Sequence, residues 1–250
     1  MQIVRVVNLD DAQSDSLSYF HQLIDDAMQA TKEMGPYRVE QVNFNVAQKR
    51  SMRLLKLPGV LDVMHTMKDK EWEQSLIRVP QSLLNGTLGT RALLVRAEDK
   101  EKFDHISIED LKKQIACQGT HWRDSDILEQ NGYSVYRVVE FDTMLRMLSI
   151  KRCDYFPRGI NEIDSDFAKF DGKYGKLAKV TNTFFKYRAP VYFYLGKHNF
   201  ALASRLSEGF YRLGGDNYIK QQLDQQITFA LNKFLNLEDT RVIKLNSQAD

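Results

Sequence analysis

The 250-residue sequence lacks the features that mark several functional classes. No apolar run approaches the ~20 residues needed to cross a bilayer. The 35 basic and 33 acidic residues leave a formal charge of +2, without a run of like charges. Because binding by phosphate neutralisation needs a clustered basic surface, we expect no nucleic-acid partner.

Catalytic and metal-binding motifs are also missing. The sequence contains no G-x-S-x-G elbow, no P-loop and no G-x-G-x-x-G, and its five histidines are scattered. We therefore expect no catalytic residue, no metal and no cofactor. An enzyme built from residues far apart in the chain stays open as an alternative.

Cysteines are scarce and an export signal is not evident. Cys117 and Cys153 match no zinc or redox spacing, and each ends a predicted strand. A small buried thiol is the usual occupant of such a position, so we expect free thiols, with a disulfide as the alternative. The start, MQIVRVVNLD, is a strand pattern. Composition therefore favours a cytoplasmic protein, and a signal removed earlier is the alternative.

What the sequence does contain is a repeated alternation of strand and helix patterns. The first series includes strands at 2–8, 37–43 and 60–65, with helices between them. After a polar segment at 97–105 the alternation restarts, and two helices close the chain at about 199–213 and 216–236. This order predicts an α/β protein of two units, each a mostly parallel sheet flanked by helices. Ligand sites lie outside the carboxyl ends of such strands, and clefts between lobes are common pockets.

Several segments resemble the family 3 bacterial extracytoplasmic solute-binding proteins, which have the type II periplasmic-binding-protein fold. They are GTHWRDSDILEQNGYSV at 119–135, FDTMLRMLSIKRCDYFPRGINEI at 141–163, LPGVLDVMHTMKDKEWE at 57–73 and YFYLGKHNFALASRLSEGF at 192–210. Their order and spacing carry the likeness, and together they cover most of the chain. The Phe-Pro-Arg-Gly sequence indicates a divergent branch.

The resemblance implies a particular organisation and role. One lobe would comprise residues 1–104 and 187–250, the other residues 105–186, with hinge crossovers near 97–105 and 186–191. The protein would be an exported, periplasmic monomer that closes on a small polar ligand, anionic or amino-acid-like, and is not an enzyme. Its partner would be a membrane transporter of the ABC type, or a receptor if the chain is a sensing domain.

The second lobe supplies most of the candidate ligand residues. Thr120 stands between a strand and a helix, where free backbone N–H groups favour an anion, although threonine is also an ordinary helix cap. His121 and Trp122 follow, and the indole either stacks on a ligand or packs under the helix. Arg158, with Gly159 beside it, suits a bidentate anion contact. The alternative is an ion pair of Arg158 with Glu162 or Asp164.

The first lobe contributes further candidates. The strand VLDVMH and the turn after it place His65, Thr66 and Met67 toward the ligand. The family's carboxylate-binding arginine is missing from the next helix, so Lys70, Arg78 or Arg91 would substitute unless they are surface charges. Tyr19 is the better cleft residue of the first helix, because the spacing of Phe20 with Leu23 favours core packing.

Overall fold

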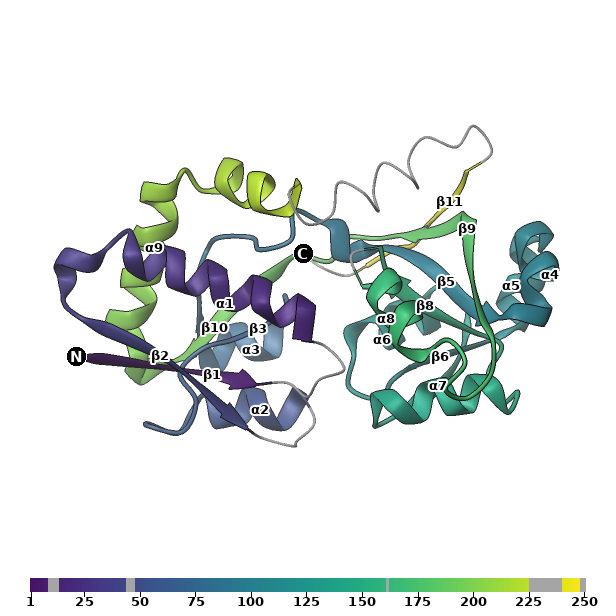
Figure 1. Ribbon diagram of the computed structural model, residues 1–250, viewed down its shortest axis with the longest axis horizontal. Coiled ribbons are helices and arrows are strands. Elements are labelled where there is room, and N and C mark those ends of the chain that lie inside the picture. The colour runs from purple at the N-terminus through teal and green to yellow at the C-terminus, as the bar shows by residue number, and fades with distance from the viewer. Residues whose placement is uncertain (9–13, 44–47, 161, 225–239, 248–250) are drawn as a thin grey trace. The chain divides into compact units, whose positions relative to one another are not determined.

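The computed structural model describes residues 1–8, 14–43, 48–160, 162–224 and 240–247 (Figure 1). The chain divides into two compact units, each containing segments that are distant in sequence. Unit 1 comprises Met1–Asn85 and Pro190–Gln225, and unit 2 comprises Gly86–Ala189 and Gln226–Asp250.

Unit 1 is built from two small sheets and the helices that cover them. Strands β1 and β2 pair in parallel, and a parallel bridge from Val6 to Val63 joins β1 to the chain leading into β3. Strand β10 pairs antiparallel with both β3 and β4. The elements are β1 (Gln2–Asn8), α1 (Ser14–Gln29), η2 (Lys32–Met34), β2 (Tyr37–Asn43), α2 (Gln48–Leu54), β3 (Met64–Met67), α3 (Lys70–Ser75), β4 (Leu76–Arg78), β10 (Val191–Gly196), η5 (Lys197–Asn199) and α9 (Phe200–Leu213).

Helices α1 and α9 lie side by side in unit 1 (Figure 1). A Cβ added to Gly209 would stand 2.1 Å from the backbone oxygen of Ala27, so only glycine permits this approach. Arg205 of α9 is buried and donates to the backbone oxygens of Thr31 and Gly35, at 3.0 and 2.8 Å. These bonds satisfy carbonyl groups just beyond the end of α1.

Unit 2 contains one six-stranded sheet in the order β11-β9-β5-β8-β6-β7. Strand β5 runs antiparallel to β8 and β9, whereas β6 is parallel to β7 and β8, and β9 is parallel to β11. The elements are η3 (Thr87–Gly89), β5 (Thr90–Arg96), η4 (Ala97–Asp99), α4 (Lys100–His105), α5 (Ile108–Lys113), β6 (Ile115–Gly119), α6 (Arg123–Gln130), β7 (Ser134–Val138), α7 (Phe141–Ser149), β8 (Tyr155–Gly159), α8 (Ile163–Phe170), β9 (Leu177–Lys186) and β11 (Arg241–Lys244).

The architecture agrees with an α/β protein of two units, but three expectations need correction. The six-stranded sheet of unit 2 is mostly parallel, with β5 antiparallel to its neighbours, but the three-stranded sheet of unit 1 is antiparallel, because β10 runs against β3 and β4. Residues 97–105 form η4 and α4 inside unit 2, so this segment is not a crossover. Unit 2 begins at Gly86 and includes β11, because β5 and β11 hydrogen-bond into its sheet. Of the last predicted helix, 216–224 is helical, and 225–236 lies outside the described residues.

The expectation of free thiols is wrong, because Cys117 and Cys153 form a disulfide with their Cα atoms 5.5 Å apart. Cys117 lies on β6, and Cys153 lies just before β8, which is its neighbour in the sheet. This separation is common for disulfides. The two positions are 36 residues apart in sequence, so only the sheet order reveals that they are adjacent.

Replacement of Gly209 by alanine is expected to lower the free energy of unfolding by roughly 1–3 kcal/mol, because the added methyl group forces α9 away from α1. Chemical denaturation monitored by circular dichroism measures the change. Ser207→Ala, on a half-buried position of the same helix, is the matched control. Equal free energies of unfolding for Gly209→Ala and Ser207→Ala would contradict the close approach of α9 to α1.

Candidate functional site

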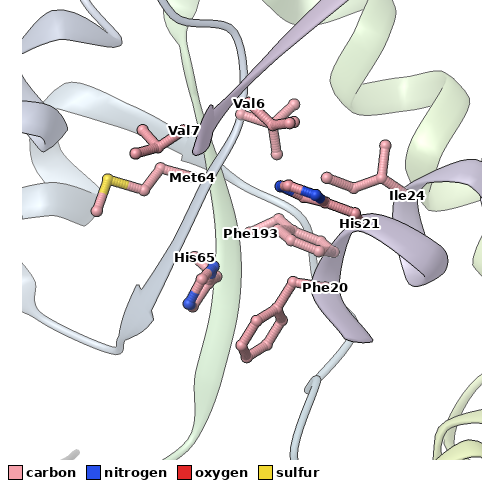
Figure 2. Close-up of a pocket in the computed structure, with 9 residues that line it drawn as sticks. Val6, Val7, Phe20, His21, Ile24, Met64, His65 and Phe193 are labelled. Atoms are coloured by element: carbon pink, nitrogen blue, oxygen red, sulfur yellow. The ribbon is translucent and has the colours of Figure 1, made fainter. Parts of the chain in front are cut away.

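The carboxyl end of β1 and the amino end of β3 in unit 1 border a small pocket, shown in Figure 2. Helix α1 contributes one wall and β10 contributes the floor. The enclosed space is about 20 Å³, which is enough for one water molecule. Most of the lining is apolar, and imidazole rings are the polar exception. The lining residues are Val6, Val7, Phe20, His21, Ile24, Val63, Met64, His65 and Phe193.

An aromatic stack lies at this pocket. The rings of Phe20 and His65 are 3.5 Å apart between centroids and inclined by 16°. His21 Nδ1 is 3.2 Å from the side-chain nitrogen of Gln41, and burial lowers the pKa of His21. Burial therefore favours the neutral form of the His21 imidazole, and the pocket offers hydrogen bonding and stacking.

The first-unit candidates differ in their surroundings. His65 lines the pocket, whereas Thr66 and Met67 are buried in β3. Tyr19 is also buried, and its hydroxyl donates to the backbone oxygen of Leu83 at 2.6 Å. Phe20 is buried as well, stacked on His65 and packed against Phe193, so core packing of Phe20 is confirmed, and the ligand role of Tyr19 stays a prediction.

Arg78 is engaged as well. Its Nε is 2.7 Å from a carboxylate oxygen of Glu73, and its guanidinium lies 4.4 Å from the ring centre of Tyr192. It is a partly exposed ion pair, not the free cation that a ligand carboxylate would need.

In unit 2, Arg91 lies at the start of β5 and is 2 % exposed. It donates to Asp124 at 2.5 Å, to Glu162 at 3.1 Å and to the hydroxyl of Tyr187 at 2.9 Å. Tyr187 in turn donates to Asp124. The expectation that Arg91 is either a free anion-binding group or a surface charge is wrong, since it is buried and fully engaged within the unit.

Arg158 is similarly engaged on β8. It is 3 % exposed, with Nε 2.5 Å from Asp166 and Nη1 3.3 Å from Glu162. Its guanidinium lies over the rings of Trp122, Phe141 and Phe156, at 5.4, 5.0 and 5.2 Å from their centres. The ion-pair alternative is therefore correct for Glu162, while Asp166 takes the place expected for Asp164, because residues 158 and 166 meet across the turn into α8. Asp164 pairs with Lys179 instead.

These side chains form one buried cluster, which we call the charge cluster: Arg91, Asp124, Arg158, Glu162, Asp166 and Tyr187. Burial alone would raise the pKa of Glu162, but Arg158 and Arg91 outweigh it and hold that pKa below the usual 4.5. Burial raises the pKa of Asp166 above 3.8, against the attraction of Arg158. The two guanidinium groups and three carboxylates give the cluster a formal charge of −1 when all are ionised.

The backbone groups of Thr120, in the segment after β6, already have hydrogen-bond partners within unit 2. The backbone N–H of Thr120 donates to Val138, and its carbonyl oxygen accepts from Arg137 at 2.9 Å. Asp124, in the first turn of α6, supplies a negative charge near the helix N-terminus. His121 is exposed and Trp122 is half-buried, so both remain accessible. Gly159 is buried and donates to Glu162.

The sequence did not indicate that Phe20 and His21 line the pocket. It also did not indicate the partners of the two arginines, which are Asp124, Asp166 and Tyr187. An acidic residue in the first turn of α6 was a visible signal, but its partner on β5 could not be read from spacing. Within the described residues, no group of three or more histidine, cysteine, aspartate or glutamate side chains is arranged to hold a metal ion.

No protein-family model matches the sequence, and no curated protein matches it. Solved structures do match. A periplasmic His/Glu/Gln/Arg/opine family-binding protein from Silicibacter pomeroyi, in complex with lysine, has a TM-score of 0.61 at 10% identity, covering 84% of this chain and 86% of that one. The periplasmic VFT2 domain of BvgS from Bordetella pertussis has a TM-score of 0.63 at 12% identity, covering 90% and 93%.

A third match is an amino acid ABC transporter substrate-binding protein from Streptococcus pneumoniae bound to L-arginine, with a TM-score of 0.57, 16% identity and 82% of each chain covered. The chain thus has the fold of the type II periplasmic binding proteins. At these identities the likeness is one of fold. In the described part of the chain, no helix is both long and apolar enough to cross a membrane.

Arg158→Leu is expected to lower the free energy of unfolding by about 3–5 kcal/mol, because it leaves Asp166 buried without its partner. The double variant Arg158→Leu with Asp166→Leu should recover much of that loss. Urea denaturation measures both. Arg78→Ala, which breaks a partly exposed pair, should cost less than about 1 kcal/mol. A cost for Arg158→Leu as small as that for Arg78→Ala would contradict the cluster's structural role.

Acid should act on the charge cluster through Glu162. Its folded pKa is lowered, so the stability it contributes is present above about pH 4.5 and is lost as the pH falls through its folded pKa. Asp166 has a raised folded pKa and acts in the opposite sense, since protonation favours the folded state. Glu162→Gln should therefore flatten the fall in melting temperature below pH 4.5. An unchanged slope between pH 4.5 and 3 would contradict this assignment.

Proposed function

We propose that this protein is an extracytoplasmic binding protein that captures a small polar, amino-acid-like solute by closure of its two units. The observation that carries the proposal is the fold, which matches binding proteins over 82–90% of the chain. The disulfide supports it, because such bonds persist in oxidising compartments outside the cytoplasm. Delivery to a membrane transporter is the role we assign first.

The preferred ligand contacts follow from what stays accessible in each unit. In unit 1 the contact is His65, which stacks on the buried Phe20 at the pocket, and in unit 2 the contacts are Thr120, His121 and Trp122. Arg91 and Arg158 are structural in this proposal, because internal carboxylates already satisfy them. The two arginines therefore no longer favour an anionic ligand, and we propose amino-acid-like solutes as the first ligand class to test.

A sensing role is the second candidate, favoured by the likeness to the BvgS VFT2 domain. In that case the same capture step would change the activity of a receptor. The gene separates the two roles: a membrane helix followed by a signalling domain in the same reading frame favours the sensor, and an export signal with a neighbouring transporter gene favours delivery.

A thermal-shift screen tests the capture step. Free amino acids, dicarboxylates, phosphates and short peptides are added to the full chain at 1 mM. A ligand present at 100 times its Kd stabilises by about 2.7 kcal/mol, which corresponds to roughly 5–10 °C in a protein of this size. His65→Ala and Trp122→Ala should each reduce the shift, whereas Arg78→Ala should not. If no compound shifts the transition while hydrolase or lyase assays show turnover, the proposal fails.

A further inference from the structure

The junction between β6 and β8 in unit 2 contains an interruption in the sheet. Pro157 lies within β8, and its carbonyl oxygen accepts from the side-chain nitrogen of Gln118 on β6 at 3.3 Å. The N and O of a strand residue face the same neighbouring strand. The nitrogen of Pro157 therefore faces β6, and it has no hydrogen to donate there.

Strand pairing reflects this interruption. β6 pairs with β7 along its whole length, and β8 pairs with β5 through five residues. Between β6 and β8, by contrast, the described pairing comprises Ala116 with Tyr155. The carboxyl end of β6 is thus held by backbone hydrogen bonds to β7. On the side of β8, side-chain contacts take the place of backbone pairing.

Two side-chain links join β6 to this part of the chain, one to the residues just before β8 and one within the interrupted stretch. The first is the Cys117–Cys153 disulfide, with both residues at most 1 % exposed. The second is the bond from Gln118 to Pro157. Gln118 is fully buried, and among the described residues its Oε1 has no hydrogen-bond partner. Burying that oxygen costs stability, so an amide at this position needs a compensating role.

The segment that these links adjoin is Gly119–Trp122. The indole of Trp122 covers Gly119 so closely that an added Cβ would stand 2.4 Å from the ring. The same indole is stacked on Phe156 of β8, with centroids 6.3 Å apart and planes 21° apart, and it lies over Arg158. Trp122 therefore contacts the carboxyl ends of both β6 and β8, and its position depends on their alignment.

We propose that the Cys117–Cys153 disulfide and Gln118 are positioning groups that replace the missing β6–β8 pairing and place Thr120 and Trp122 for ligand contact. The site in unit 2 then forms fully in oxidised protein. Disulfide formation takes two electrons and two protons from the thiols, and a disulfide oxidant such as glutathione disulfide accepts them and is released as two thiols. The ligand-contact part of this inference rests on the proposed function.

Fluorescence of Trp122 tests the positioning directly, without a ligand. The chain has two tryptophans, so Trp72→Phe leaves Trp122 as the single emitter. In this background, Cys117→Ser with Cys153→Ser and, separately, Gln118→Leu are compared with the parent at a temperature where circular dichroism shows folded protein. Both should move the emission to longer wavelength and raise acrylamide quenching at least twofold. Gly119→Ala, which displaces the indole directly, is the positive control.

Val180→Ala separates local from general loosening, because it opens a fully buried core position on β9, which is not a neighbour of β6. It should lower the melting temperature and leave the emission of Trp122 unchanged. Gln118→Leu retains the disulfide, so the test holds even if the double serine variant does not fold. Unchanged emission in Gln118→Leu, or an equal change in Val180→Ala, would overturn the inference.

The two proposals fail separately. A ligand found in the thermal-shift screen, together with an unmoved Trp122 in the variants, overturns the positioning role and keeps the binding role. A displaced Trp122, with no ligand in the screen and turnover in the hydrolase or lyase assays, keeps the positioning role and overturns the binding role.

Discussion

The carboxyl ends of β6 and β8 in unit 2 depend on one interaction, the neutralisation of two buried guanidinium groups by three carboxylates. Arg91 and Arg158 come from adjacent strands, and Glu162 contacts both of them. An unpaired charge at this depth would be strongly destabilising. The helices that supply the carboxylates, α6 and α8, therefore have to dock where the arginines are. The cluster thereby fixes helix positions around the carboxyl ends of β6 and β8.

The same neutralisation changes which ligand chemistry is reasonable. An arginine that already binds carboxylates at 2.5 Å is not available to a solute anion, unless binding breaks a buried pair. Glu162 is the most exposed of the three carboxylates, with 20% of its side chain accessible, against 8% for Asp124 and 4% for Asp166. The most exposed charge of the cluster is therefore negative, and the buried arginines act as scaffold.

In unit 1, aromatic packing and not a charge cluster determines the geometry of the pocket. Its pocket combines a phenyl–imidazole stack with aliphatic walls and leaves room for little more than a water molecule. Stacking holds the His65 ring in one orientation, which is useful for a residue that presents a polar edge. A core cluster of this unit, which includes Met52, Leu61, Trp72 and Tyr194, holds β3 through Met64.

The sequence by itself determined the alternation of strands and helices, the two-unit α/β class and most helix positions, because these depend on local periodicity and caps. It also placed Thr120 and Arg158 at the carboxyl ends of strands, since a strand end is a local property, but it ended at His65 a strand that in the structure runs from Met64 to Met67. Tertiary structure decided the rest. Sheet order brings Cys117 to Cys153 and Arg91 to Asp124, and pairing direction makes the sheet of unit 2 mixed. These outcomes depend on which distant strands become neighbours, and spacing along one chain carries no information about that.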